Sequence, residues 1–157
     1  SDGLLELSEQ PCSPPAALDF DQVLELEPVT IRLASVPVDS RDQPFFFHKT
    51  TRRDEYEQLR QEAALEGLFD VICWNREGEV TEGAICNLFI FSDGCYYTPA
   101  RHCGLLDGVM RRHLLAGDTG TVIRERVLSR DEVRQADRVF VCNSVRGVLP
   151  ARWFGSG

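Results

Sequence analysis

Lysine is almost absent from this chain, which holds 17 lysine and arginine residues together but a single lysine, Lys49. An arginine guanidinium stays protonated in proteins, whereas a buried lysine amine can lose its proton and attack a carbonyl group. Lys49 follows an aromatic run at residues 45–47, which we expect to be a strand. This context favours a nucleophilic amine, but a surface lysine left by codon bias is an equal alternative from the count alone.

Long apolar runs, zinc motifs and an excess of positive charge are missing as well. The longest hydrophobic runs have the length of strands, so none is predicted to span a bilayer. The net charge of -8 argues against nucleic acid or an anionic membrane as partner. The six cysteines form no C-x-x-C pair and no zinc-type cluster, so we expect neither a metal site nor a disulfide framework. With no signal-peptide pattern at the start, we expect a cytoplasmic protein.

The body of the chain alternates between strand and helix patterns. At 157 residues, 43% of them hydrophobic, one domain is expected. We expect residues 1–29, interrupted by prolines, to be a linker or the remnant of a preceding region, with a strand-like stretch at 23–26. Hydrophobic periodicity and turn residues then predict the following elements. Strands are expected at 29–35, 69–74, 79–81, 87–91, 95–98, 122–127 and 138–142, and helices at 53–66, 109–115 and 129–136.

Three further segments carry candidate chemistry beside Lys49. Glu82 stands on a hairpin return, where a carboxylate could pair with a protonated pyridine nitrogen, although a solvated hairpin charge is the alternative. Residues 104–111 form a glycine-flanked turn that opens a helix and offers backbone N–H groups to a phosphate, although many such helices bind nothing. Residues 142–148 place polar donors after a buried strand, where an ordinary Asn/Ser turn is the alternative.

In order and spacing, Lys49, Thr81-Glu82-Gly83, residues 104–111 and Asn143-Ser144-Val145 resemble the fold-type IV pyridoxal-phosphate enzymes. That family holds branched-chain aminotransferases, D-amino-acid aminotransferases and aminodeoxychorismate lyases. The segments 48–56 and 142–147 look most like the lyase half of the bifunctional para-aminobenzoate synthase component I/aminodeoxychorismate lyase proteins. The resemblance covers about residues 30–153.

The resemblance implies a fold, a cofactor and residue roles. Residues 30–157 would form the family's large domain, a mixed α/β domain with a barrel-like mixed sheet and outer helices, and pyridoxal 5'-phosphate would be the cofactor. Lys49 matches the lysine that binds the cofactor covalently and acts as general base, and Glu82 matches the carboxylate on the pyridine nitrogen. The remaining matches surround the cofactor's phosphate and ring: Val109, Met110, Asn143 and Ser144 at the phosphate, and Leu106 and Gly108 near the ring. Arg146 has two interpretations, a partner for a substrate carboxylate or a surface residue.

The implied reaction is the conversion of 4-amino-4-deoxychorismate to 4-aminobenzoate and pyruvate, a step of folate biosynthesis. The alternatives are a class IV aminotransferase of branched-chain or D-amino acids and, from another class, a non-catalytic docking or dimerisation domain. The family also implies a small-molecule substrate, a homodimer, and fusion to or association with aminodeoxychorismate synthase component I. The chain departs from the family pattern in two places. Cys86 stands where serine is frequent, and the family's small N-terminal domain is not recognisable in residues 1–44.

Overall fold

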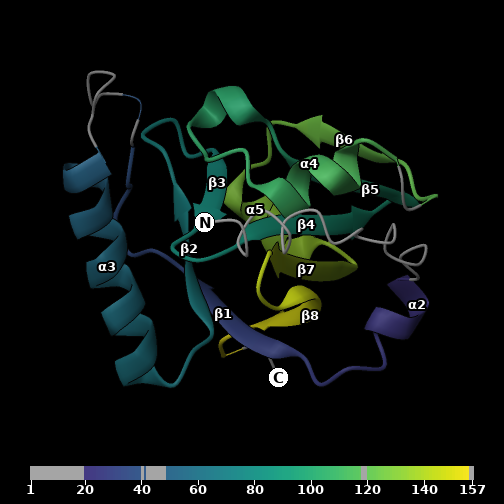
Figure 1. Ribbon diagram of the computed structural model, residues 1–157, viewed down its shortest axis with the longest axis horizontal. Helices are drawn as coiled ribbons and strands as arrows, with labels where there is room; N and C mark the ends of the chain where they lie inside the picture. The colour runs from purple at the N-terminus through teal and green to yellow at the C-terminus, as the bar shows by residue number, and fades with distance from the viewer. Residues whose placement is uncertain (1–19, 40, 42–48, 118–119, 156–157) are drawn as a thin grey trace, which may run out of the picture.

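The computed structural model describes residues 20–39, 41, 49–117 and 120–155, without the side chains of residues 49–53. Within this part, eight strands form one mixed sheet, and helices lie around it (Figure 1). The strands are β1 (Val29–Leu33), β2 (Asp70–Trp74), β3 (Val80–Gly83), β4 (Asn87–Ser92), β5 (Cys95–Pro99), β6 (Ile123–Arg126), β7 (Arg138–Asn143) and β8 (Gly147–Trp153). The helices are α2 (Phe20–Val23), α3 (Lys49–Glu66), α4 (Val109–Leu115) and α5 (Arg130–Gln135), with a 3-10 turn η2 (Arg101–Cys103).

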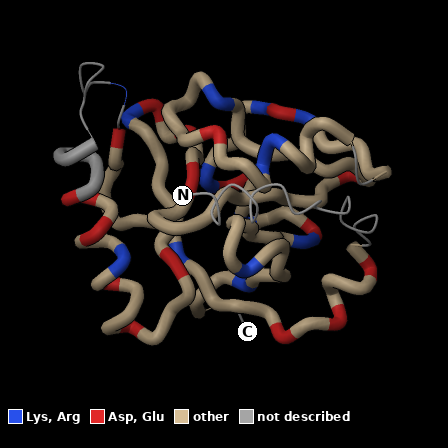
Figure 2. The backbone as a smooth tube through the Cα atoms, in the orientation of Figure 1, with Lys and Arg blue, Asp and Glu red and all other residues tan. Residues whose placement is uncertain are grey.

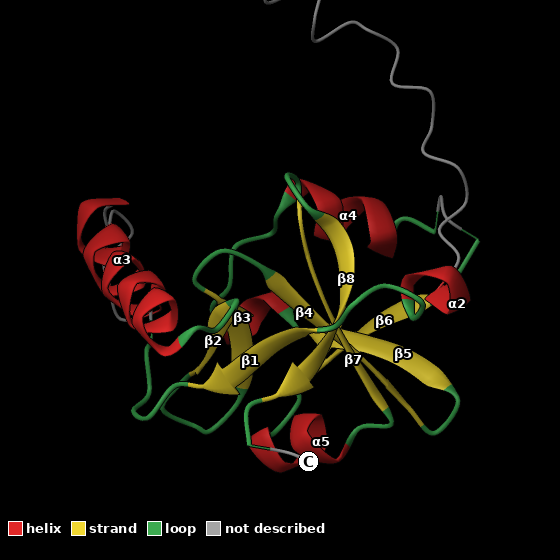
Figure 3. Cartoon of the chain, turned by 90° about the horizontal axis from the view of Figure 1, so that it is seen from below, coloured by secondary structure: helices red, strands yellow, loops and turns green. Residues whose placement is uncertain are grey.

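The strand order in the sheet is β3-β2-β1-β8-β7-β4-β5-β6. Strand β1 runs parallel to β2 and β8, and β5 runs parallel to β6, whereas the other neighbours are antiparallel. The sheet twists strongly, with its strands fanned across one another (Figure 3), and the edge strand β3 contacts β4 and β5. The predicted mixed α/β fold with a curled, barrel-like sheet is therefore confirmed.

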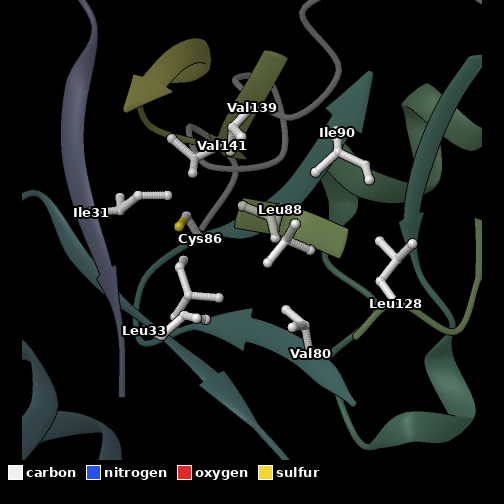
Figure 4. Close-up of a cluster of buried hydrophobic side chains, with 11 residues drawn as sticks. Ile31, Leu33, Val80, Cys86, Leu88, Ile90, Leu128, Val139 and Val141 are labelled. Atoms are coloured by element: carbon white, nitrogen blue, oxygen red, sulfur yellow. The ribbon is translucent and has the colours of Figure 1, made fainter. Parts of the chain in front are cut away.

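Side chains that alternate along the strands supply two faces of the sheet with separate cores. Inside the curl, Leu88 and Ile90 of β4 meet residues of β1, β3 and β7, as Figure 4 shows, and Val133 of α5 joins them. On the opposite face, Phe89 packs with Leu114 of α4. A third cluster joins Leu59 and Ala63 of α3 to Val71 and Cys73 of β2.

Ion pairs add to this apolar contact between α3 and the sheet. Arg32 of β1 donates to Glu62 at 3.1 Å and to Glu66 at 2.7 Å, both on α3. Figure 2 shows acidic and basic residues spread over the elements rather than gathered by sign. None of the described helices combines the length and the apolar character that a membrane crossing requires.

The turns form where short-range signals predict them. Asn75 Oδ1 accepts the N–H groups of Glu77 and Glu79, which closes the β2–β3 hairpin. Asp93 and Gly94 have φ values of 53° and 79°, as a two-residue primed turn between β4 and β5 requires. Ser129 caps α5 with the reciprocal bonds of a capping box.

The structure differs from the expected elements at three places. The strand-like stretch at 23–26 is instead helix α2 and a turn, because Phe20 is buried against Tyr96, with ring centroids 4.3 Å apart. The helix expected from residue 53 begins at Lys49. The sequence predicts one more apolar segment that ends before Pro150, whereas strand β8 runs through this proline. Residues 147–151 of β8 pair with β7, and residues 151–153 pair with β1. The aromatic strand expected at 45–47 lies outside the described residues, and the division at residue 29 stays a prediction.

Candidate active site

A pocket of about 610 Å³ opens at the ends of β3 and β7 and the start of α4. It is lined by residues from α3, β3, the turn after β3, the loop before α4 and the end of β7. Seven of the residues predicted for the cofactor site meet here: Glu82, Leu106, Gly108, Val109, Met110, Asn143 and Ser144. The pocket therefore brings together segments that are far apart in the sequence.

Glu82 is a buried carboxylate in the pocket wall, with only 4% of its surface exposed. Every residue of β3 is buried, so the strand carries the carboxylate out of solvent. The Tyr56 hydroxyl donates to Glu82 Oε2 at 2.7 Å, and the Leu106 N–H donates to Oε1 at 3.1 Å. Donors on both oxygens offset part of the cost of burying a charge. The alternative of a solvated hairpin charge is wrong for this residue.

Asp70 holds the turn that follows Glu82. Its side chain is fully buried, and each oxygen accepts two hydrogen bonds. Oδ1 accepts the N–H groups of Val71 and Ala84 at 2.8 and 3.0 Å, and Oδ2 accepts the Ile85 N–H at 2.9 Å and the Cys86 thiol at 3.0 Å. Burial raises the pKa of the Asp70 carboxyl, against the effect of these donors. Burial likewise raises the pKa of the Cys86 thiol, so this cysteine stays protonated.

The loop before α4 forms the opposite wall. Asn87 Nδ2 donates to the Leu106 carbonyl at 3.2 Å, and a Cβ on Gly108 would lie 2.8 Å from Asn87 Oδ1. Gly108 is the N-cap of α4, and no side chain caps that end of the helix. Leu106 and Val109 are 63% and 64% exposed, although both are large and apolar. Uncapped N–H groups and apolar side chains thus stand side by side at the pocket.

Arg111 of α4 anchors this loop to the sheet. Its guanidinium is 2% exposed and donates to Asp107 at 2.6 Å, to Glu125 at 2.7 Å and to the Pro99 carbonyl at 3.1 Å. The first turn of α4 and the loop before it are therefore tied to β5 and β6. Arg111 thus supports the loop through its buried ion pairs, and it does not line the pocket itself.

Asn143 joins the third wall to the turn after Glu82. Its Nδ2 donates to the Ile85 carbonyl at 3.0 Å, while Oδ1 accepts the N–H groups of Val145 and Arg146 at 3.0 and 2.7 Å. Ser144 is held in this turn and lines the pocket. Arg146 does not line the pocket, and its exposed guanidinium lies 5.5 Å from the ring centroid of Phe69.

Lys49 is the first residue of α3, and its side chain lies outside the described part of the structure. Of the residues that support the pocket, the sequence assigned no role to Tyr56, Asp70 or Asn87. Tyr56 reads as a core position of an amphipathic helix, and Asp70 reads as the boundary of an apolar strand. Among the described residues, no group of histidine, cysteine and acidic side chains is placed to hold a metal.

Comparison with known proteins identifies relatives of this arrangement. Residues 5–153 match the family model of Amino-transferase class IV, whose members use pyridoxal phosphate. A Schizosaccharomyces pombe protein provisionally named aminodeoxychorismate lyase is 32% identical over 81% of this chain and 56% of its own length. The Escherichia coli branched-chain-amino-acid aminotransferase is 36% identical over 58% of this chain and 30% of its own length.

Solved structures show the same fold. The PLP form of a branched-chain amino acid aminotransferase from Thermobaculum terrenum superposes with a TM-score of 0.67 at 26% identity, covering 86% of this chain and 45% of that one. The chain spans about half the length of the S. pombe relative and less of the E. coli one. The resemblance of the sequence to the fold-type IV enzymes is confirmed.

Proposed function

The chain belongs to the class IV aminotransferase family, and on this premise we propose that it is part of a lyase that converts 4-amino-4-deoxychorismate to 4-aminobenzoate and pyruvate. The observation that supports a pyridoxal-phosphate site, which this reaction requires, is the buried Glu82 carboxylate in the pocket wall, with a donor on each oxygen. The lyase name of a relative that matches 81% of the chain supports this reaction over amino-group transfer. We further propose that residues 30–157 form the large domain of the enzyme.

The residues of the pocket fit pyridoxal phosphate. The volume of about 610 Å³ lies in the usual range for small-molecule sites. Glu82 would accept the N–H of the protonated pyridine, and Leu106 and Gly108 would lie near the ring. The uncapped N–H groups of Val109 and Met110 would face the phosphate, with Asn143 and Ser144 closing the site opposite. When bound, the cofactor supplies an electron sink for negative charge that develops on the substrate.

The chain's own residues then have distinct tasks. The Tyr56 hydroxyl and the Leu106 N–H each donate to one oxygen of Glu82, and so would hold the carboxylate in place to accept the N–H of the pyridine. Lys49 Nζ would remove the proton from the amine-bearing ring carbon of the substrate. Loss of that proton makes the ring aromatic as the C–O bond to the pyruvate-forming side chain breaks.

The helix register supports this task for Lys49. Lys49 and Tyr56 both belong to α3, and seven residues correspond to nearly two turns of an α-helix. Position 49 therefore lies on the helix face from which Tyr56 reaches Glu82. The lysine and the carboxylate would then act on one bound molecule.

A lysine-dependent visible absorption band and product analysis test the proposal. In the full-length protein with pyridoxal phosphate, Lys49→Ala should abolish the band, and Glu82→Gln should abolish 4-aminobenzoate formation. Glu57→Gln is the matched control, because Glu57 also lines the pocket but is half-exposed and paired with Arg60. A Lys49→Ala protein that keeps the band would refute the assignment of the lysine.

The nearest alternative, an aminotransferase, would use the same Lys49 and Glu82. The E. coli relative favours it. Incubation with a branched-chain or D-amino acid and 2-oxoglutarate separates the two reactions, because a lyase should form little glutamate. Abundant glutamate without 4-aminobenzoate would replace the lyase by the aminotransferase.

The third candidate is a non-catalytic docking or dimerisation domain, which a full-length protein without a lysine-dependent band would favour. We propose a cytoplasmic homodimer whose site is completed by a smaller domain, fused to or associated with aminodeoxychorismate synthase component I. Sedimentation of the full-length protein, alone and with the synthase, tests these partners. A full-length protein that sediments as a monomer and does not bind the synthase would refute both the homodimer and the association.

A further inference from the structure

We propose that Asp70 is a positioning residue that sets the geometry of the pocket wall between Glu82 and Asn143. This inference rests on the proposed function, because it concerns how the same pocket holds its cofactor. Asp70 itself does not line the pocket, and its carboxylate acts through the turn at residues 84–86.

The turn at residues 84–86 supplies three of the four hydrogen bonds that the Asp70 carboxylate accepts. Ala84, Ile85 and Cys86 each donate to Asp70, the first to Oδ1 and the other two to Oδ2. All three donors are neutral, and all three belong to residues that line the pocket. A buried carboxylate that accepts several such bonds is rigid, because any shift leaves polar groups unsatisfied.

The same turn carries the constraint to the other side of the pocket. The Ile85 N–H donates to Asp70, and the Ile85 carbonyl accepts from Asn143 Nδ2 at 3.0 Å. Asn143 Oδ1 in turn accepts two N–H groups of the turn that holds Ser144. One residue of the wall is thus bonded on both sides of its backbone, and Asp70 lies at the start of the chain of bonds.

The Asp70 carboxylate packs directly against the backbone of Gly83. A Cβ at this position would lie 2.1 Å from Asp70 Oδ2, closer than any two such atoms approach in proteins. The residue directly after Glu82 therefore has no room for a side chain. The position of Asp70 and the path of the chain beyond Glu82 are specified together.

Asn75 provides a matched anchor without contact to the pocket. It follows the same strand β2 at its other end, is fully buried, and holds the β2–β3 hairpin through Glu77 and Glu79. It does not line the pocket. A purely structural role of Asp70 predicts equal consequences for the two anchors, whereas a positioning role predicts that only Asp70 changes cofactor binding.

The test compares Asp70→Asn with Asn75→Ala in the full-length protein. Asparagine keeps the size of the side chain but replaces one acceptor oxygen by a donor, so two of the four bonds lose their acceptor. We measure the dissociation constant for pyridoxal phosphate, the pH at which its absorption band titrates, and the urea midpoint. Asp70→Asn should weaken cofactor binding by at least about tenfold and move the titration of the band, as loss of a hydrogen bond to a charged group implies. Asn75→Ala should lower the urea midpoint alone.

Each outcome decides the matter. Equal cofactor affinity of the two variants overturns the positioning role and leaves the proposed function intact. A wild-type protein without a lysine-dependent band overturns the proposed function, and the inference with it. If Asp70→Asn does not fold, the pair Cys86→Ala and Cys86→Ser decides, because both change the same pocket-lining side chain but only alanine removes the donor to Oδ2. A loss of cofactor affinity in the alanine variant that the serine variant does not share supports the role, and equal affinity of the two overturns it.

Discussion

Replacing Gly83 by alanine tests the packing beneath the pocket most directly. Its φ lies outside the left-handed region, so alanine can adopt the backbone conformation. The obstacle is space, because the new Cβ would lie 2.1 Å from Asp70 Oδ2 and 2.8 Å from Cys86 Sγ. The effect of the substitution therefore measures the rigidity of the buried carboxylate.

The expected loss follows from how far the carboxylate must move. Ordinary contact begins at 3.4 Å, so Oδ2 must retreat by more than 1 Å. That shift breaks its bonds with the Ile85 N–H and the Cys86 thiol, which are 2.9 and 3.0 Å long. Hydrogen bonds to a charged group contribute about 1.5–3 kcal/mol each, so we expect a loss of about 3 kcal/mol. For a domain of this size, the melting temperature should fall by roughly 6–12 °C.

Urea denaturation and a double-mutant cycle with Asp70→Ala provide the assay. In the Asp70→Ala background the clash with Oδ2 is gone and only the 2.8 Å approach to Cys86 Sγ remains, so Gly83→Ala should lower the free energy of unfolding by clearly less than it does beside Asp70. Gly108→Ala is the graded control, since its Cβ would stand 2.8 Å from Asn87 Oδ1 and displace that amide only slightly. An equal loss from Gly83→Ala in both backgrounds would refute the contact as the cause.

Three further predictions concern the frame around the site. Ser129→Ala should lower the free energy of unfolding by about 1 kcal/mol in urea, because the capping box is lost, and an unchanged midpoint would contradict this. Arg111→Ala should lower it by about 3 kcal/mol or more, since two carboxylates lose their guanidinium, whereas the exposed Arg112→Ala should change it by less than about 0.5 kcal/mol. Two hydrogen bonds lower the pKa of Glu132, the larger effect coming from the Ser129 backbone N–H and the smaller from the Arg126 guanidinium. The stability that Glu132 contributes to the fold is therefore present at neutral pH, and it is lost as the pH falls below about 4.3 and through the lowered pKa. In measurements of the free energy of unfolding against pH, Glu132→Gln should reduce the loss of stability at acid pH. An unchanged loss would show that Glu132 does not contribute to it.

The elements that the sequence predicts well are those with local causes. The hairpin at Asp93-Gly94 and the capping box at Ser129 need only a few adjacent residues, and both lie at the ends of elements that the sequence predicts. Helix α4 covers the predicted residues 109–115, since glycines bound it on both sides. Helix α2 could not be predicted, because the Phe20 ring is stacked on a residue more than seventy positions away.

The candidate site divides in the same way. Motif order predicted that Glu82 and Asn143 would share a site, and the pocket brings both together. Their supports were hidden, because Asp70 and Tyr56 act through bonds that cross from one element to another. No spacing in the sequence encodes a contact between the first residue of β2 and the turn after β3, since the bulge in the β2–β3 pairing sets that register.

The curvature of the sheet is what makes a pocket from these distant segments. In the strand order, β3 and β7 are separated by three other strands, and in a flat sheet Glu82 and Asn143 would stand far apart. The turn from β3 to β4 closes that gap, because β4 is the direct neighbour of β7 and pairs Asn87 with Cys142. The Ile85–Asn143 bond lies one step beyond that pair, where the two strands end. A ligand that contacts both walls binds only the curled form of the sheet, so its binding energy adds to the stability of the fold.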